Sequence, residues 1–177
     1  MSNRLLIVVD MQNDFVSGSL GTEEAKKIVP NVVNLVKEYK EDTFYSDIIF
    51  TRDTHGRNYL NTDEGKHLPI KHCIDGTPGW CIIDELQDYA YKILNKNKFG
   101  YGNWENYIYG LPRVPHEITL VGLVTDICVI TNAVLLKTLL SDIKIRVDAS
   151  CCAGTTPEKH KAALEVMKSC QIEVINE

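Results

Sequence analysis

Short apolar runs alternate along the chain with longer segments of helical periodicity. Residues 5–9 read LLIVV, a continuous apolar run typical of a strand covered on both faces. Similar runs predict further strands at 47–51, 91–94, 118–123, 143–147 and 172–175. Helical spacing predicts helices at 23–39, with Thr22 as N-cap, and at 81–91, 126–140 and 157–170. This alternation favours an α/β fold: a three-layer, doubly wound, Rossmann-like and mostly parallel sheet of about six strands with helices on both faces.

One long stretch, residues 52–80, breaks this pattern. It contains Gly, His, Asn, Asp and Pro but little periodicity, and a loop of that length in a compact domain is usually functional. In doubly wound sheets, sites form outside the carboxyl ends of the strands. Asp10, Asp53, Lys96 and Cys128 follow the first four predicted strands, so we expect these side chains to meet at one edge of the sheet.

The composition is ordinary for a globular protein, with 44% apolar and 24% charged residues, and a length of 177 residues suits one domain spanning 1–177. The net charge of −5 and the dispersed Lys and Arg argue against nucleic acid or an anionic membrane as a partner. The first apolar run is too short for a signal peptide and no later run approaches a membrane span, so we expect a cytoplasmic protein. Its six cysteines are then expected to be reduced.

Cys128 stands where a predicted strand gives way to a helix. A free Cys packs like a small hydrophobe, but in the first turn of a helix the backbone N–H groups and the dipole stabilise a thiolate. Asp10 directly follows a buried strand; backbone N–H groups could satisfy its carboxylate, or it could take the thiol proton and return it to a leaving amine. Lys96 could hold Asp10 ionised and lower the thiol pKa, and spacing alone does not distinguish it from Lys98.

The irregular stretch also holds candidate metal ligands. Asp53 and His55 are two apart, which in an extended segment puts both side chains on one face. Glu64, His67 and His72 add further oxygen and imidazole groups. Mixed His and carboxylate ligation suits a divalent metal such as zinc, manganese or iron, with open positions for substrate or water. The alternative is that these loop histidines are simply solvated.

Several aromatic and sulfur-bearing residues have two interpretations. Phe15 lies close enough to Asp10 to line the same cleft, by stacking on a flat substrate or by packing in the core. Trp80 and Trp104 could line a pocket, although aromatic side chains in a domain interior usually pack. Core packing is the expectation for the remaining cysteines considered: Cys73, Cys151, Cys152 and Cys170.

Five segments together resemble one known family. In chain order they are LLIVVDMQNDFV, TRDTH, HCIDGTPG, KNKFG and VGLVTDICVITNAV. Each alone is only suggestive, whereas all five in this order and at compatible spacing make a specific match. They resemble the isochorismatase-like cysteine hydrolases, and within them the nicotinamidase (pyrazinamidase) branch, over nearly the whole chain.

This resemblance implies a catalytic triad of Asp10, Lys96 and Cys128. It selects Lys96 over Lys98, because the family's lysine lies three residues before the Phe of the KNKFG segment. It also implies a cis peptide before Val124 and an oxyanion hole built from the backbone N–H groups of Val124 and Cys128. The fold that it implies is the same doubly wound α/β sheet.

The resemblance further implies a metal held by Asp53, His55 and His72, with Glu64 as the fourth ligand, as in one branch of the family. Two departures lie just before His72: LPIKH has one residue more than the family's usual segment, and Leu68 replaces an aromatic residue that helps to sandwich the substrate ring. Phe15 and Leu68 are therefore the candidate pocket residues, and the ring-binding pocket is where this chain differs.

The implied activity is that of a cysteine-dependent, metal-assisted amidohydrolase that works through a thioester. Nicotinamide, converted with water to nicotinate and ammonia, is the first candidate substrate, and zinc is the expected metal, with manganese or iron as alternatives. Another small amide, carbamoyl or ureido compound is the second candidate. A non-catalytic metal or thiol sensor on the same fold is a third reading. The family also implies a homo-oligomer that acts on a small molecule.

Overall fold

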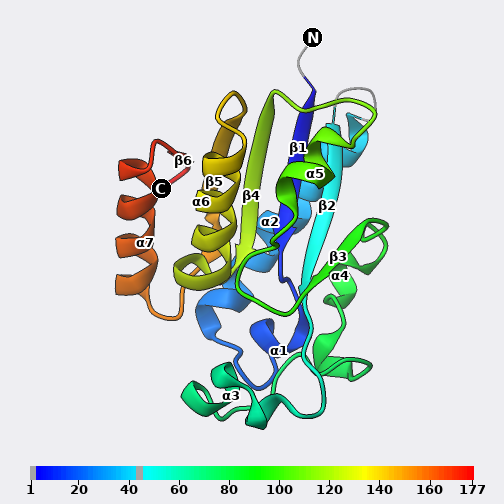
Figure 1. Ribbon diagram of the computed structural model, residues 1–177, viewed down its shortest axis with the longest axis vertical. Coiled ribbons are helices and arrows are strands. Elements are labelled where there is room, and N and C mark those ends of the chain that lie inside the picture. Colours follow the sequence, from blue (N-terminus) through cyan, green and yellow to red (C-terminus); the bar gives the residue numbers. More distant parts are fainter. Residues whose placement is uncertain (1–2, 43–45) are drawn as a thin grey trace.

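The computed structural model of the protein describes residues 3–42 and 46–177 and is built around one parallel sheet (Figure 1). Its strands run in the order β3-β2-β1-β4-β5-β6, and every neighbouring pair is parallel. The strands are β1 (Arg4–Val9), β2 (Ser46–Asp53), β3 (Ile93–Lys96), β4 (Glu117–Leu123), β5 (Lys144–Ala153) and β6 (Glu173–Ile175). The predicted doubly wound sheet is therefore confirmed, with all six strands parallel rather than most of them.

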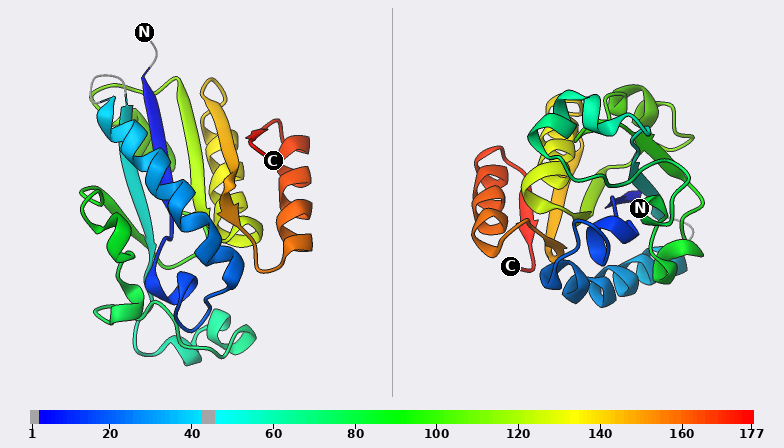
Figure 2. Two further views of the ribbon diagram at one scale, coloured as in Figure 1. Left: turned by 180° about the vertical axis from the view of Figure 1, so that it is seen from behind. Right: turned by 90° about the horizontal axis from the view of Figure 1, so that it is seen from below.

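Helices cover both faces of this sheet, as predicted. Buried side chains of α1 (Asn13–Val16), α2 (Glu23–Glu41) and α4 (Asp84–Gln87) share one core cluster. The other cluster contains buried side chains of α5 (Trp104–Tyr109), α6 (Ile130–Leu139) and α7 (Pro157–Ser169). Seen from below in Figure 2, α2 lies on one side of the strands and α5 and α6 on the other. Short elements complete the chain: η1 (Tyr59–Asn61), α3 (Asp63–His67), η2 (Pro78–Trp80) and η3 (Thr125–Val129).

The apolar run of β1 explains why two layers of helices are needed. Leu5, Ile7 and Val9 belong to the core cluster on one face, whereas Leu6 and Val8 belong to the cluster on the other. All five side chains are at most 1% exposed. Burial of an aliphatic side chain contributes about 1.5–3 kcal/mol, so a strand with this composition is stable only when both of its faces are covered.

The start of α2 follows the predicted capping pattern. The hydroxyl of Thr22 accepts a hydrogen bond of 3.0 Å from the backbone N–H of Ala25. Such a cap satisfies one of the N–H groups that have no partner within the helix and contributes about 1 kcal/mol.

The predicted helix at 81–91 is wrong in length, since only α4 (Asp84–Gln87) is helical there. The reason is a tertiary contact that periodicity does not report. The backbone of Cys81 and Ile83 pairs with the segment after β1: Asn13 N–H donates to the Cys81 carbonyl at 3.0 Å, and Ile83 N–H to the Met11 carbonyl at 3.0 Å. This pairing holds the start of the segment in an extended conformation.

Other helix and strand boundaries also differ from the predicted ones. β3 begins two residues later than predicted, so Lys96 is the last residue of the strand rather than a residue beyond it. β5 extends through Ala153 and therefore includes Cys151 and Cys152, which are 3% and 4% exposed and pack in the core as expected. The predicted helix at 126–140 starts as the wide π-helical turn η3 before α6 begins at Ile130. Helices α1, α3 and α5 were not predicted.

Candidate active site

The candidate site lies at the carboxyl ends of the strands, where the strand order changes direction. The chain moves outward from β1 to β2 and β3, and then returns to place β4 on the other side of β1. Ligands bind in the crevice that such a reversal creates. Asp10 follows β1 and Cys128 follows β4, so both border this crevice. Figure 1 shows α1 and α3 at the same end of the sheet, below the strands.

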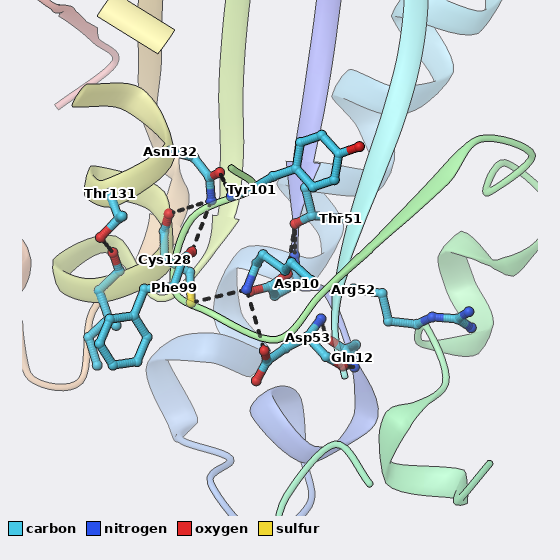
Figure 3. A network of polar contacts seen from close by, with 12 residues as sticks. Asp10, Gln12, Thr51, Arg52, Asp53, Phe99, Tyr101, Cys128, Thr131 and Asn132 are labelled. Atoms are coloured by element: carbon cyan, nitrogen blue, oxygen red, sulfur yellow. Dashed lines mark hydrogen bonds and ion pairs between the residues drawn. The ribbon is translucent and has the colours of Figure 1, made fainter. Parts of the chain in front are cut away.

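Three of the predicted side chains meet around the Lys96 ammonium group. Its Nζ atom lies 2.6 Å from Asp10 Oδ2 and donates to Cys128 Sγ at 3.6 Å. All three residues are buried, with 0%, 5% and 5% of Asp10, Lys96 and Cys128 exposed. Spacing alone did not decide whether Lys96 or Lys98 is the partner of Asp10 and Cys128. The structure places Lys98 on the loop after β3, where it is exposed. The structure therefore places a carboxylate, an ammonium group and a thiol in one water-poor cluster (Figure 3).

The backbone at Asp10 turns sharply to bring the carboxylate into this cluster. Asp10 has a φ of 48°, in the left-handed region that Asp tolerates better than most residues. The Thr51 hydroxyl donates to Asp10 Oδ1 at 2.7 Å and fixes the side chain. Next to it, Gly122 has a φ of 113°, and a Cβ atom there would lie 2.1 Å from the Val9 carbonyl oxygen. A glycine is thus required for β4 to approach β1 at the crevice.

Burial determines how these groups are ionised. Burial raises the pKa of the Cys128 thiol well above its usual value, and the Asp10 charge raises it further, while Lys96 opposes both. Burial lowers the pKa of Lys96, but the Asp10 and Asp53 carboxylates outweigh it and the net shift is upward. Lys96 thus lowers the thiol pKa as expected, but burial and Asp10 outweigh it and the net shift is upward. Cys128 rests as a thiol, and its proton has to be removed by a neighbouring base.

That base is available at the right place. Burial raises the pKa of Asp10, an effect that Lys96 opposes and Asp53 adds to. Among the described residues, Asp10 Oδ2 is the buried side-chain atom that lacks a hydrogen bond of normal geometry, although it has the Lys96 ion pair. A carboxylate with a raised pKa and an oxygen still free to accept is suited to taking a proton from the thiol and giving it up again.

The candidate metal ligands also converge. Asp53, His55 and His72 place one ligand atom each within 4.8 Å of one another, and all three residues are buried. His55 Nε2 is 2.9 Å and His72 Nε2 is 3.6 Å from Asp53 Oδ2. Glu64 Oε1, from α3, lies 3.7 Å and 3.8 Å from the same two histidine atoms. His67 is exposed and turns back to the Asp63 carbonyl, so the structure brings Glu64 and not His67 to the cluster.

These residues fit a divalent metal ion. His72 Nδ1 lies 2.9 Å from the Ile70 carbonyl oxygen, an arrangement that assigns the proton to Nδ1 and leaves Nε2 free to ligate. Burial raises the pKa of Asp53, but the adjacent His55 and His72 rings and the Lys96 charge outweigh it and the net shift is downward, so the group is a carboxylate. Two imidazoles and two carboxylates form a donor set that suits zinc, manganese or iron.

Asp53 links the two clusters. Its Oδ2 atom faces the histidines, whereas its Oδ1 atom lies 3.6 Å from Lys96 Nζ. The thiol half of the site (Asp10, Lys96 and Cys128) and the metal half (Asp53, His55, Glu64 and His72) are therefore in direct contact.

The cis peptide bond implied by the resemblance is present between Leu123 and Val124. Val124 is the residue before η3, and its carbonyl oxygen accepts from Ile127 and Val129 at 3.1 Å each. Among the described residues, the N–H groups of Val124 and Cys128 donate no hydrogen bond outside that turn. The two donors predicted for an oxyanion hole thus flank a single helical turn.

The sequence matches the Isochorismatase domain family over residues 4–177. The chain belongs to the isochorismatase family. This confirms the resemblance drawn from the five sequence segments.

Individual members of the isochorismatase family cover nearly the whole chain. The nicotinamidase/pyrazinamidase of Mycobacterium tuberculosis is 27% identical over 187 residues, which covers 97% of this chain and 98% of that protein. A pyrazinamidase of Pyrococcus horikoshii, solved in complex with zinc, is 28% identical with a TM-score of 0.84 and covers 99% of each chain. N-carbamoylsarcosine amidase from Thermoplasma acidophilum is 25% identical with a TM-score of 0.80, over 97% of this chain and 95% of that one.

The candidate pocket residues lie close to the metal half of the site. Phe15 is 8% exposed, and its ring lies 5.6 Å from that of His72. Leu68 is half-buried at the end of α3, and its carbonyl oxygen accepts from the Tyr59 hydroxyl at 2.9 Å. The sequence did not single out Tyr59, although its buried ring lies 4.7 Å from His55 and 4.9 Å from His72.

The two tryptophans differ in their roles. Trp104 is fully buried, and its indole donates to Asn132 at 2.8 Å, so it packs in the core. Trp80 is half-buried; its indole donates to Thr54 at 2.8 Å, and the Arg52 guanidinium lies 3.4 Å from its ring centre. All six cysteines are free. Cys73 is buried in a core cluster as expected, and Cys170 is partly buried and packs against the other cluster. In residues 3–42 and 46–177, no helix combines the length and apolar character needed to cross a membrane.

Three polar residues that support the site were not predicted. Gln12 bonds to the backbone of Asp53, Asp14 accepts from Cys73 N–H at 2.8 Å beside His72, and Asn132 bonds to the carbonyl of Cys128. Gln12 and Asn132 are both 0% exposed. For Asn132 the signal in the sequence was a single amide residue in an otherwise apolar predicted helix, since buried polar groups require partners.

Proposed function

We propose that the protein is a cysteine-dependent, metal-assisted amidohydrolase that converts nicotinamide and water to nicotinate and ammonia. The observation that carries this proposal is the buried contact of Lys96 Nζ with Asp10 Oδ2 at 2.6 Å and with Cys128 Sγ at 3.6 Å, directly beside a metal-ligand cluster. The relative from Mycobacterium tuberculosis, named as a nicotinamidase/pyrazinamidase, supports this substrate class.

In the first half of the reaction, Cys128 Sγ attacks the carboxamide carbon while Asp10 takes the thiol proton. Lys96 remains an ammonium group and offsets the negative charge that develops between the thiol and the carboxylate. The carbonyl oxygen, now an oxyanion, accepts hydrogen bonds from the backbone N–H groups of Val124 and Cys128. Each such donor typically contributes about 3 kcal/mol to the transition state.

In the second half, Asp10 returns its proton to the leaving nitrogen. The C–N bond breaks, ammonia departs, and a thioester with Cys128 remains. Asp10 then takes a proton from an attacking water molecule, the C–S bond breaks, and the thiolate is protonated again as nicotinate leaves. One carboxylate thus serves as base in both steps and as acid in between, which fits its raised pKa.

Asp53, His55, Glu64 and His72 are the residues that would hold the metal. When bound, the ion would supply a Lewis-acid position for the pyridine nitrogen of the substrate. Zinc is the proposed metal, since the Pyrococcus horikoshii pyrazinamidase is described in complex with zinc. Manganese and iron remain alternatives for the same donor set.

A second candidate substrate is a small carbamoyl or ureido compound. Two observations favour it: Leu68 stands where the family pattern has a ring-stacking aromatic residue, and a solved neighbour is named N-carbamoylsarcosine amidase. Such a substrate is cleaved at the same kind of C–N bond but does not need an aromatic sandwich.

The test is ammonia release by purified, zinc-loaded protein from nicotinamide and, separately, from an N-carbamoyl amino acid. The Cys128→Ala variant serves as the blank. Cysteine-dependent release from nicotinamide is the expected result, and release from the carbamoyl compound alone would establish the second candidate. Stoichiometric modification of Cys128 without ammonia from either compound would instead identify a non-catalytic thiol sensor.

A further inference from the structure

Gln12 is buried beside the active site, and all the polar atoms of its side chain are used. Its Nε2 group donates to the Asp53 carbonyl and to the Trp80 carbonyl, at 2.9 Å each. Its Oε1 atom accepts from Asp53 N–H at 2.7 Å. Gln12 thus forms hydrogen bonds with both the N–H and the carbonyl group of Asp53. Figure 3 shows the two side chains next to each other below Asp10.

These hydrogen bonds of the Gln12 side chain take the place of backbone pairing with a neighbouring strand. The parallel register of β1 with β2 ends at Val8 and Phe50, and the chain then turns away at Asp10, where φ is 48°. Beyond that point no backbone from β1 remains to pair with Asp53. The side-chain amide of Gln12 supplies one acceptor and one donor to the Asp53 peptide groups, as a residue of a neighbouring strand would do.

The other edge of Asp53 is held by β3. Asp53 is in register with Lys96, and Thr54 N–H donates to the Lys96 carbonyl at 2.8 Å. With Gln12 on one side and β3 on the other, the backbone of Asp53 is fixed. Its carboxylate then points one oxygen at His55 and His72 and the other at Lys96.

We infer that Gln12 is a positioning residue for the metal half of the site, which holds Asp53 in a ligating orientation before a cation arrives. The inference rests on the proposed metal site. Gln12 carries no charge and is assigned no contact with substrate. Gln12 therefore acts through Asp53. Without it, the Asp53 carboxylate would have to become ordered when the metal binds, and the free energy of that ordering would lower the metal affinity.

Asn132 provides a matched control, because it is a second fully buried amide that supports the thiol half instead. Its Nδ2 group donates to the Cys128 carbonyl at 2.8 Å and to the Phe99 carbonyl at 3.2 Å. Its Oδ1 atom accepts from Tyr101 N–H at 2.9 Å and from the Trp104 indole at 2.8 Å. Loss of either amide therefore leaves several buried polar groups without partners, on opposite sides of the crevice.

The experiment compares Gln12→Met with Asn132→Leu in the full chain. Zinc affinity is measured by competition with a chromophoric chelator, and alkylation of Cys128 in metal-free protein is followed by mass spectrometry of the cysteine peptide. Gln12→Met is expected to weaken zinc binding by about 10-fold to 100-fold, the usual effect of removing a group that orients a ligand, with Cys128 alkylation within about two-fold of wild type. Asn132→Leu is expected to change alkylation and leave zinc affinity within about three-fold.

Wild-type zinc affinity in folded Gln12→Met would overturn the inference, and so would an equal loss in Asn132→Leu, which would indicate general destabilisation. If Gln12→Met does not fold, Gln12→Glu is measured in the same way, since it keeps the acceptor for Asp53 N–H but not the two donors. Hydrogen exchange of the Asp53 amide in metal-free wild-type protein needs no variant. Protection is expected, and exchange as fast as in an exposed loop would overturn the inference. Absence of zinc binding by the wild type would instead refute the proposed metal site.

Discussion

The two halves of the site are held in place by different parts of the fold. In the thiol half, Asp10 and Lys96 stand at the ends of β1 and β3, and Cys128 lies in the turn that follows β4. In the metal half, only Asp53 belongs to a strand. His55 is joined to Ile74 by an isolated bridge, Glu64 comes from the five-residue helix α3, and His72 comes from the irregular segment between α3 and η2.

This difference extends to burial. The thiol half is at most 5% exposed, whereas the Glu64 side chain is 25% exposed and marks an open side of the metal half. Rings rather than strands support the histidines, with Tyr59 against both and Phe15 against His72. The comparison teaches that the sheet fixes the thiol half, while side-chain contacts, and in our proposal a bound cation, fix the metal half.

The largest expected effect separates chemistry from metal binding. Cys128→Ala removes the proposed nucleophile and is expected to reduce ammonia release at least about 10³-fold, because the thioester would form on the thiol that contacts Lys96. Zinc binding should be retained, since the variant leaves all four proposed ligands in place. The measurements are steady-state ammonia release and zinc content. Cys170→Ala, at the end of α7, is the matched control and should behave as wild type. Substantial activity in Cys128→Ala would disprove the mechanism.

The converse change is His55→Ala. Removal of a ligand should weaken zinc binding by at least about 100-fold, since loss of an outer-shell partner alone costs about 10-fold to 100-fold. Substrate binding should weaken with it, while the rate of Cys128 alkylation in metal-free protein stays close to wild type. The variant His67→Ala changes an exposed histidine five residues before His72 and is the control. If His55→Ala also altered the thiol, the two halves would not be separable.

The sequence predicted the thiol half well because strand ends have simple geometry. Apolar runs located the strands, parallel strands share a carboxyl edge, and Asp10, Lys96 and Cys128 had to approach that edge. The charge state of the thiol was not predictable, since it depends on how completely Cys128 and Asp10 are buried together. Residues that act through a backbone group, such as Gln12 and Asn132, leave no spacing signal.

The metal half was predicted by composition and resemblance rather than by geometry. Asp53 and His55 share a face because they are two apart in an extended segment, which is a local rule. The approach of Glu64 and His72 depends on the path of an irregular loop, which no period describes. The failure of the predicted helix at 81–91 has the same origin, because pairing with Met11 and Asn13 is a tertiary contact.

The Asp10–Lys96 ion pair should make the thiol half sensitive to charge. Lys96→Met leaves a buried carboxylate without its counter-charge and is expected to cost about 3–5 kcal/mol in the free energy of unfolding, with loss of activity. Adding Asp10→Asn removes that charge, so the double variant should recover stability but not activity. Urea denaturation of the single and double variants measures this. Lys26→Met breaks the exposed pair of Lys26 with Glu23 and should leave the urea midpoint close to that of wild type.

A smaller expected effect, again in the thiol half, is the pH dependence of Cys128 alkylation. Because burial and Asp10 raise the Cys128 pKa, the folded protein holds the proton at neutral pH, and alkylation of Cys128 should still increase with pH above the ordinary cysteine pKa of about 8.5. Asp10→Asn removes one cause of the raised pKa and should shift the profile to lower pH. A profile already flat below neutral pH in wild-type protein would show a preformed thiolate, contrary to this account.

The smallest expected effect concerns the turn that carries the nucleophile. Thr125 is fully buried in η3, and its hydroxyl lies 2.8 Å from His160 Nδ1 on α7. Thr125→Val keeps the shape but removes this hydrogen bond, which is worth about 1 kcal/mol, so kcat should fall by about five-fold or less as the turn loosens. Zinc affinity should not change, because α7 contributes no metal ligand. Thr138→Val is the control: the Thr138 hydroxyl bonds to the Val134 carbonyl within α6 at 2.7 Å, and its loss should leave kcat unaltered. A change in zinc affinity rather than in kcat for Thr125→Val would mean that the sheet does not keep the two halves independent.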